Sequence, residues 1–311
     1  SGRYGSDAQQ LPKPLEEGED APIIVKYVNI VRAFLTAGKG RKVIDSDYES
    51  LEPHCFASVS GDEKLQEIFD NNYDFYSYVA IQTEKLEGVS ADKKADNYLK
   101  KLDPVKRNKA KAYSLGVAYG MEAYALKMTL GVDQKTAEGL IKGYLDGFPQ
   151  LRDWRENSHK KVKENGFIKN YVGRVRHLPR VKKIYDKFGE RMMDWRFRKD
   201  LEAQGYGRDQ VLKVYRDYRN GLNNCLNFQL QSLAAAVVNR AAVQINRAAK
   251  ENNIDAYVQA QVHDQLIINV SEDQAEEFAP IVQKIMETTT QLPGITLKAP
   301  PEIANNWKDG H

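Results

Sequence analysis

Two aspartates stand where short apolar runs of the chain end. Asp47 follows Val43-Ile44 within Asp45-Ser46-Asp47-Tyr48, and Asp264 lies in Val262-His263-Asp264-Gln265. Such runs predict strands that stop at the edge of a site, and carboxylates on rigid strand ends are the hard oxygen ligands that Mg²⁺ requires. The two residues are 264 − 47 = 217 positions apart, so spacing alone does not bring them together. Either aspartate by itself is also typical of a turn or a helix cap.

A second group of residues that could take part in chemistry forms a row on one predicted helix. Asp103-Pro104 combines an N-cap with proline at the first helical position, so a helix is expected from there to Tyr119-Gly120. Arg107, Lys111 and Leu115 recur every four residues and therefore share one face. The planar guanidinium and the compact ammonium both suit phosphate oxygens, although a solvated basic face gives the same pattern.

The elements that must position these residues belong to an α+β chain with helix in excess. Residues 1–30 are rich in Pro, Gly and acidic residues and are expected to be irregular. Helical spacing of apolar residues predicts a helix over residues 63–82, broken at Asn71-Asn72. A charged helical insert is expected up to Gly221, followed by an alanine-rich helix over residues 223–252.

The C-terminal region is expected to carry a hairpin and a last helix. Residues 257–261 and 266–270 read as two strands joined by the turn that holds Asp264. Ser271, with Gln274 three residues later, predicts a capping box that opens a helix to about residue 289.

Composition places the chain among globular proteins that are not held together by disulfides. Its 311 residues include 41% hydrophobic residues, and no apolar run approaches a membrane span. Cys55 and Cys225 are too few for a disulfide framework, so both are expected to be packed in the interior of a cytoplasmic protein. Residues 151–220 hold 20 Lys and Arg against 10 Asp and Glu, and the rest of the chain therefore carries +3 − 10 = −7. A basic segment of this kind attracts a phosphate backbone.

In their order along the chain these segments resemble the signature of DNA polymerase family A, the group that includes the Klenow-type bacterial enzymes. The segment Asp47-Tyr48-Glu49-Ser50-Leu51-Glu52 is similar to the first palm motif of that family, and Val262-His263-Asp264 is similar to the third. The residues similar to the fingers helix are Arg107, Lys111, Gly116, Tyr119 and Gly120. Smaller similarities fill the intervals: Ser60-Gly61-Asp62, Gly173-Arg174, Leu178-Pro179, Asn227, Gln231 and Asn306-Trp307.

The resemblance implies a palm of antiparallel sheet and a mostly helical fingers subdomain. The palm would comprise residues 1–62 and 222–311, and the fingers residues 63–221, with a basic insert at about 181–220. Two Mg²⁺ ions, which Mn²⁺ can replace, would be held by Asp47, Asp264 and the Tyr48 carbonyl. They would drive attack of a primer 3′-hydroxyl on the α-phosphate of a deoxynucleoside triphosphate.

The resemblance also assigns roles to individual side chains. Arg107 would hold the γ-phosphate, Lys111 would stabilise or protonate the pyrophosphate, Tyr119 would pack near the templating position, and Glu52 would crowd the sugar 2′ position. The residues expected to contact primer-template DNA are Arg3, Asn227, Gln231, His263 and Gln265. For His263, simple packing within the hairpin is the alternative.

Several positions depart from the family pattern. Leu115 stands where an aromatic residue usually stacks near the incoming sugar, and Gln265 replaces the usual Glu after the second aspartate, which keeps hydrogen bonding but loses a charge. A thumb and an exonuclease domain precede the matching segment in family members and are not found in this chain. Weak, distributive DNA binding is therefore expected. Two explanations of the missing domains stay open: a split polymerase in which a separate chain supplies them, or a fragment of a longer protein. In a phage-like system the compartment would be the host cytoplasm.

Two other functions fit some of these residues. A single-subunit RNA polymerase of the phage type shares the aspartates, Arg and Lys, but a carboxylate at Glu52 argues against acceptance of a ribose 2′-hydroxyl. A non-catalytic nucleic-acid-binding replication subunit would not need Asp47, Asp264, Arg107 and Lys111 together.

Overall fold

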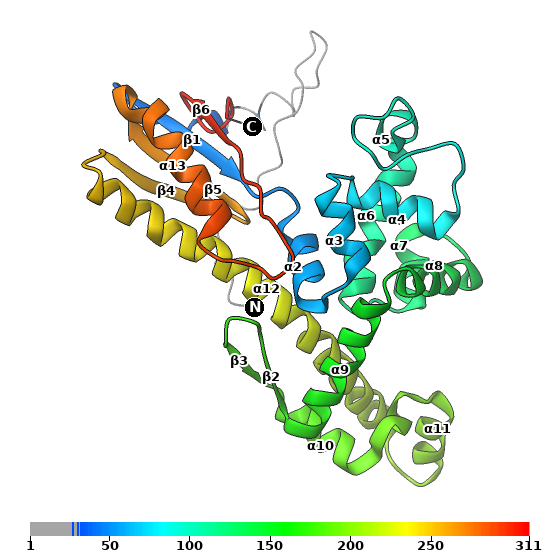
Figure 1. The fold of residues 1–311 in the computed structure, drawn as a ribbon. Helices are drawn as coiled ribbons and strands as arrows, with labels where there is room; N and C mark the ends of the chain where they lie inside the picture. Colours follow the sequence, from blue (N-terminus) through cyan, green and yellow to red (C-terminus); the bar gives the residue numbers. More distant parts are fainter. Residues whose placement is uncertain (1–26, 28–29, 31, 311) are drawn as a thin grey trace. The chain divides into compact units, whose positions relative to one another are not determined.

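The computed structural model describes Tyr27, Ile30 and residues 32–310 (Figure 1). Arg3 and nearly all of the expected irregular lead-in lie outside these described residues. Among them the chain forms two compact units. The sheet unit contains the described residues up to 51, together with residues 234–292 and 296–310. The helical unit contains residues 52–233 and 293–295.

The sheet unit is built on a four-stranded antiparallel sheet in the order β4-β5-β1-β6. The bounds are β1 Arg41–Asp47, β4 Ala256–Val262, β5 Gln265–Ser271 and β6 Pro301–Ala304. Of the central strands, β5 is buried from its first residue to its sixth and β1 over its middle four residues, as expected for strands covered on both faces. The helix α13, Ala275–Thr288, packs against β1 and β6. The antiparallel α+β fold expected from the sequence is confirmed.

A small apolar cluster joins strands β1, β4 and β5 of the sheet. Val43 of β1, Val262 of β4 and Ile267 of β5 pack with Ala37 and Trp307, and the Trp307 side chain is fully buried. The guanidinium carbon of Arg32 lies 4.1 Å from the Trp307 ring centroid. Strand β1 is therefore held by this cluster at Val43 and by backbone pairing with β5 and β6 before it ends at Asp47.

The helical unit consists of short helices and one small hairpin. Helices α3 and α4 are separate, as the Asn71-Asn72 break predicts, and Asp62 and Asp74 are their N-caps. Asp62 also accepts backbone hydrogen bonds from Gln150 and Leu151 at the start of α9. The elements are α2 Leu51–Ser60, α3 Glu63–Asp70, α4 Phe75–Glu84, α5 Leu99–Leu102, α6 Pro104–Ala118, α7 Ala123–Leu130, α8 Gln134–Gly147, α9 Pro149–Asn165, β2 Phe167–Lys169, β3 Val175–His177, α10 Pro179–Phe188, η2 Gly189–Met193 and α11 Trp195–Ala203.

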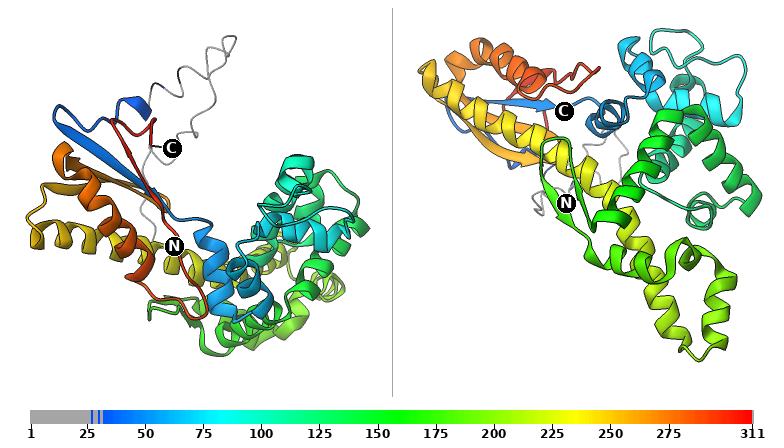
Figure 2. Two further views of the ribbon diagram at one scale, coloured as in Figure 1. Left: turned by 45° about the horizontal axis from the view of Figure 1, so that its top comes forward. Right: turned by 60° about the horizontal axis from the view of Figure 1, so that its bottom comes forward.

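One long helix contributes residues to both units. Helix α12 runs without interruption over Arg208–Glu251, a length of 44 residues. The sequence predicted a start at 223, after Gly221, and that boundary is wrong. A Cβ at Gly221 would lie 2.3 Å from Val181 Cγ2, so this glycine permits close packing of α12 on α10 and does not end a helix. Both views in Figure 2 show the C-terminal part of α12 alongside the sheet, where Asn246 accepts a hydrogen bond from Val258 N–H of β4.

The predicted capping box at the start of the last helix is also wrong. Residues Glu272–Gln274 form a 3₁₀ turn, η3, before α13, and the Ser271 hydroxyl donates to Asp273 instead of capping the helix. The Gln274 side chain reaches back to the loop before β4, where it accepts from Asp255 N–H. This tertiary contact overrides the local motif.

Two further sequence expectations can be compared with the described residues. Cys55 and Cys225 are both free thiols with buried side chains, as expected. Across the part of the chain that the structure describes, no helix combines the length and apolar character needed to cross a membrane.

Candidate active site

The pairing of β1 with β5 brings two distant aspartates to one edge of the sheet. Asp47 is the last residue of β1 and pairs with Gln265, the first residue of β5. Asp264 directly precedes Gln265, and its carbonyl accepts a hydrogen bond of 3.4 Å from Tyr48 N–H. Neighbouring antiparallel strands place the end of one beside the start of the other. Residues separated by 217 positions in sequence therefore become neighbours through strand register.

The turn that carries Asp264 has only two residues. His263 adopts a left-handed conformation with φ of +56° and is exposed, while Asp264 is half-buried. A two-residue connection fixes the register of the hairpin, and the strained position is taken by a non-glycine residue. The role expected for His263 near the primer end stays a prediction.

The Gln265 side chain turns inward from the same edge. Its Nε2 donates to Asp45 Oδ1 and Oδ2 at 2.6 and 2.8 Å, and its Oε1 accepts from Trp307 Nε1 at 3.2 Å. The pKa of Asp45 is raised to about 7, because burial and the charges of Asp47 and Glu302 outweigh the hydrogen bonds from Gln265. The DNA contact expected for Gln265 stays a prediction, because in this structure its amide is used to hold a buried carboxyl group in place.

Tyr48 and Glu52 follow the first aspartate along the chain. The Tyr48 ring is buried, and its hydroxyl donates to the Met286 carbonyl of α13 at 2.7 Å. This contact fixes the backbone that follows β1, including the carbonyl expected to assist metal binding. Glu52 is half-buried in the first turn of α2, within the helical unit.

Helix α6 carries the basic residues that the sequence singled out. Asp103 caps it and Pro104 opens it, as predicted. Arg107 donates from Nε and Nη2 to the two carboxylate oxygens of Asp74, both at 3.0 Å. Its guanidinium carbon also lies 4.9 Å from the Tyr76 ring centroid. The fork of Arg107 is therefore held on one side by a bidentate ion pair and on another by an aromatic ring.

The ion pair changes the protonation equilibrium of its acidic partner. Burial alone would raise the pKa of Asp74, but hydrogen bonds from Arg107 and Ser77 and the Arg107 charge outweigh burial, so the pKa lies below its ordinary value. Sequence reasoning missed Asp74 because Asp with Ser77 three residues later indicates only a helix cap. The ion pair with Arg107 gives no local signal, because Arg107 is 33 positions away in the sequence.

The remaining members of the α6 row differ in exposure. Lys111 is exposed, and its Nζ lies 5.8 Å from the Tyr76 ring centroid, while Leu115 is half-buried. Tyr119 is the C-cap of α6, with its ring centroid 5.2 Å from that of Phe56. Gly120 then takes φ of +96°, and a Cβ there would lie 2.5 Å from Asn223 Oδ1. The end of α6 is thus packed closely on α12 within the helical unit.

Asn227 and Gln231 lie one turn apart on α12, and both are half-buried. Asn227 Oδ1 is enclosed and accepts no hydrogen bond from the residues that the structure describes. A nearby serine has a structural role, since the Ser232 hydroxyl accepts from Asn170 Nδ2 at 2.7 Å. The DNA contacts expected for Asn227 and Gln231 stay predictions.

The donor set at the sheet edge fits a hard divalent cation. Asp47 supplies a carboxylate from the end of β1 and Asp264 supplies one from the turn before β5, and the Tyr48 carbonyl follows directly after β1. No cluster of three or more His, Cys, Asp or Glu side chains suited to a metal occurs among the described residues. A pair of carboxylates leaves coordination positions for phosphate oxygens and water, which Mg²⁺ retains in phosphoryl-transfer sites.

The chain combines two carboxylates at one edge of an antiparallel sheet with Arg and Lys one turn apart on a helix. This combination is expected of a polymerase domain that transfers nucleotidyl groups. Comparison with known proteins gives the family: residues 9–309 match the model of DNA polymerase family A. The chain therefore belongs to this family, as the sequence motifs indicated.

Curated relatives agree with the family assignment. The chain is 26% identical to the thermostable DNA polymerase I of Thermus filiformis over 93% of its length. It is also 26% identical to DNA polymerase I of Pseudomonas aeruginosa over 94% of its length and 25% identical to that of Bacillus caldotenax over 99%. The chain spans 28–30% of the length of these three relatives.

A solved structure shares the fold. The POL domain of Pol1 from M. smegmatis, in complex with DNA primer-template and dNTP, superposes with a TM-score of 0.75 at 23% sequence identity. The similarity covers 97% of this chain and 44% of that one.

Proposed function

We propose that this chain is a template-directed DNA polymerase domain that adds deoxynucleotides to a primer 3′ end. The observation that carries the proposal is the pairing of β1 with β5, which brings Asp47 at the end of β1 beside the turn that carries Asp264, in a chain that belongs to DNA polymerase family A. Primer-template DNA and deoxynucleoside triphosphates are the proposed substrates. A relative of the same fold was solved with both.

In the proposed reaction, Asp47 and Asp264 hold two Mg²⁺ ions, with the Tyr48 carbonyl as a further ligand and Mn²⁺ as a possible replacement. When bound, such ions make the primer 3′-hydroxyl nucleophilic and neutralise charge on the leaving pyrophosphate. Asp47 ends a central strand and Asp264 sits in a two-residue turn between paired strands, so the backbone keeps both carboxylates preorganised and little reorganisation is required during the reaction.

The residues of α6 act on the triphosphate in this proposal. Arg107 holds the γ-phosphate with the part of its fork that Asp74 leaves available, because the ion pair uses Nε and Nη2. The exposed Lys111 stabilises or protonates the pyrophosphate. Tyr119 packs near the templating position, and Leu115 takes the place of an aromatic residue near the sugar.

The remaining assignments concern the sugar and the DNA. Glu52 excludes a ribose 2′-hydroxyl, and His263 positions the primer end from the exposed turn. Asn227, half-buried on α12, contacts the template-primer duplex. Gln231 lies one turn further along α12 and contacts the same duplex.

The test is primer extension by the purified chain with Mg²⁺ and all four deoxynucleotides. Asp264→Asn removes one ligand charge and is expected to lower the extension rate at least about 100-fold, which corresponds to about 2.7 kcal/mol of transition-state stabilisation. Asp273→Asn, an exposed change in the same unit, is the matched control and should leave the rate unchanged. Thermal melting of both variants establishes that each is folded.

An unchanged extension rate in Asp264→Asn would contradict the metal-ligand assignment and favour a non-catalytic DNA-binding subunit. Equal incorporation of ribonucleotides and deoxynucleotides would contradict the DNA polymerase assignment and favour the RNA polymerase alternative.

A further inference from the structure

The turn that carries Asp264 is connected to buried side chains of the sheet unit at both of its ends. It is flanked by Val262, the last residue of β4, and Gln265, the first residue of β5, and these two residues are paired with each other. Val262 belongs to the apolar cluster that includes Trp307, and the Gln265 side chain accepts a hydrogen bond from the same indole. One fully buried ring therefore supports both ends of the turn.

The other end of the Gln265 amide bonds to a carboxyl group on the neighbouring strand. Asp45 lies two residues before Asp47 on β1 and therefore on the same face of the sheet. Because Asp47 is directly opposite Gln265, Asp45 is the diagonal neighbour of Gln265, close enough for the side chains to meet. Gln265 Nε2 donates to both carboxylate oxygens of Asp45, at 2.6 and 2.8 Å.

This network is closed to solvent. Asp45, Gln265 and Trp307 have relative exposures of 2%, 4% and 0%. A Cβ at Gly310 would lie 2.9 Å from Asp45 Cβ, so the backbone at Gly310 packs directly on the Asp45 side chain. Enclosed hydrogen bonds are costly to break when water cannot replace them, so the Gln265 amide is confined to one position.

The carboxyl group of Asp45 and the amide of Gln265 are chemically matched. An ionised carboxyl group accepts hydrogen bonds and donates none, so its neighbour must supply N–H groups. Gln265 supplies them, whereas an ionised Glu would not. The pairing with Asp45 thus gives a physical reason for an amide at a position where members of the family usually carry Glu.

We propose that Asp45 is a positioning residue for the turn that carries Asp264. It acts through Gln265: the bonded amide fixes the first residue of β5, and a connection of two residues leaves Asp264 little freedom relative to that strand. This role rests on the proposed function, which assigns Asp264 to metal binding. Asp45 itself contacts neither metal nor nucleotide in this role.

Two substitutions at Asp45 separate hydrogen bonding from charge. Both remove the charge, including its attraction to the nearby Arg32, so the difference between them isolates the hydrogen bonds. Asp45→Leu keeps a similar shape but offers no acceptor to Gln265 Nε2. Asp45→Asn keeps a carbonyl oxygen for Nε2 and has an N–H group to donate to Gln265 Oε1.

Primer extension measures the effect on the reaction. Asp45→Leu is expected to lower the rate at saturating deoxynucleotide about 10- to 100-fold, the range for a small misplacement of reacting groups. The KM for the deoxynucleotide should not change, because the residues proposed to bind the triphosphate lie on α6. Asp45→Asn should stay within about threefold of the unaltered chain, since the hydrogen bonds are retained.

Amide hydrogen exchange gives a second readout that does not require activity. Peptides that cover residues 262–267 report on the turn and the start of β5. In the metal-free chain their exchange should be at least about tenfold faster in Asp45→Leu than in the unaltered chain, and nearly unchanged in Asp45→Asn. Trp307→Phe removes the indole N–H and keeps an aromatic ring, so it should change both readouts in the same direction, and it serves if Asp45→Leu does not fold.

Ser46→Ala is the matched control. It removes another buried hydrogen bond of β1, from the Ser46 hydroxyl to the Ala299 carbonyl at 2.9 Å, on the opposite face of the strand. Thermal melting should show some loss of stability in this variant, whereas the exchange of the turn and the extension rate should stay close to those of the unaltered chain.

Equal losses of rate in Asp45→Leu and Asp45→Asn would overturn the proposal, because the charge and not the hydrogen bonds would then matter. An unaltered rate or unaltered turn exchange in Asp45→Leu would overturn it too, as would equally fast turn exchange in Ser46→Ala. If the unaltered chain extends no primer, the proposed function fails, and the exchange measurements still decide whether Asp45 fixes the turn.

Discussion

Asp74 serves two functions with a single carboxylate. It caps α4 through Ser77 N–H and holds Arg107 in a bidentate ion pair, with side-chain exposures of 8% for Asp74 and 15% for Arg107. Removing one member of a buried pair leaves the other charge uncompensated. The position of the arginine proposed to bind the γ-phosphate therefore depends on an acid that lies outside the polymerase motifs.

Asp74→Asn tests this dependence, since Asn is as good an N-cap as Asp. We expect a loss of about 3 kcal/mol in the free energy of unfolding at neutral pH, from the broken pair. The folded-state pKa of Asp74 is lowered, so its contribution is present above about pH 4 and disappears as the pH falls through the folded-state value. The stability of the variant should consequently fall less than that of the unaltered chain between about pH 5 and pH 2.

Denaturant unfolding at several pH values measures both effects. Asp133→Asn is the control, because Asp133 is an exposed N-cap that bonds Thr136 and has no ion pair with a basic side chain among the described residues. Parallel pH profiles for Asp74→Asn and the unaltered chain would show that the ion pair does not contribute to stability.

At the scale of elements, α12 depends on a close approach that only glycine permits. Gly221→Ala would place a methyl group 2.3 Å from Val181 Cγ2, and a β-branched side chain on α10 has little freedom to move away. We expect a loss of about 1–3 kcal/mol in the free energy of unfolding, as for other overpacked sites. The expected gain in helix propensity, up to about 1 kcal/mol, offsets only part of it.

Gly139→Ala on α8 is the matched control. This glycine is helical and exposed, and an added Cβ would meet nothing within 4 Å. Thermal or denaturant unfolding should show Gly139→Ala to be neutral or stabilising. A stabilising Gly221→Ala would show that the two helices are less closely packed than described.

Features set by neighbouring residues were predictable from the sequence, and features set by distant residues were not. Strand β1, the hairpin and the Asp103-capped α6 were predictable because a short apolar run, a connection between two such runs and an N-cap are local signals. The start of α12 and the hydrogen bond of Gln274 to Asp255 N–H were not predictable, because contacts between residues distant in sequence determine them. For the same reason the Asp74–Arg107 pair was missed.

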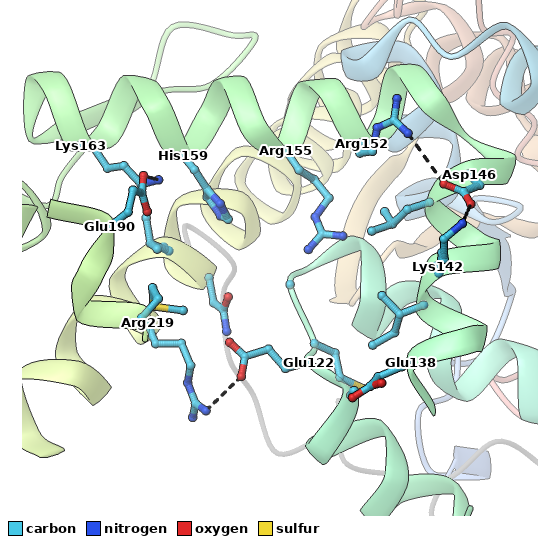
Figure 3. A pocket seen from close by; sticks show the side chains of 18 residues that line it. Glu122, Glu138, Lys142, Asp146, Arg152, Arg155, His159, Lys163, Glu190 and Arg219 are labelled. Carbon is cyan, nitrogen blue, oxygen red and sulfur yellow. Dashed lines mark hydrogen bonds and ion pairs between the residues drawn. The ribbon is translucent and has the colours of Figure 1, made fainter. Parts of the chain in front are cut away.

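The partly enclosed basic row on α9 was missed although a signal existed. Arg152, Arg155, His159 and Lys163 repeat at helical spacing and project from one side of the helix (Figure 3), but a basic row most often indicates a solvated face. Only the enclosure of Arg155 and His159 distinguishes this row from an ordinary one, and burial of a charged residue is not visible in sequence.

At the scale of the whole molecule, charge is unevenly distributed along the chain. Residues 151–220 carry 20 basic and 10 acidic side chains, and they belong to the helical unit. In this segment Lys183, Arg196 and Lys199 are exposed and form no ion pair with another described residue. If the segment contacts duplex DNA, each phosphate contact contributes about 0.9 to the slope of log affinity against log salt.

Replacement of these three residues by Gln is expected to reduce that slope by up to about 2.7, if all three contact phosphates. Fluorescence anisotropy with a labelled primer-template over a range of salt concentrations measures it. The control removes the same charge elsewhere, through Lys64→Gln, Lys135→Gln and Lys250→Gln on exposed positions. Equal slopes for the two triple variants would show that the basic segment has no special part in binding.

The pairing of β1 with β5 also makes the chemistry sensitive to slippage. A shift of one residue would send every side chain of β1 to the opposite face, including Asp47, while the hydrogen-bonding capacity of the backbone would be largely retained. The interlocked apolar side chains Val43, Val262 and Ile267 oppose that shift. These aliphatic residues, which touch neither nucleotide nor metal in the proposed reaction, therefore safeguard the alignment of the acidic pair as much as the turn does.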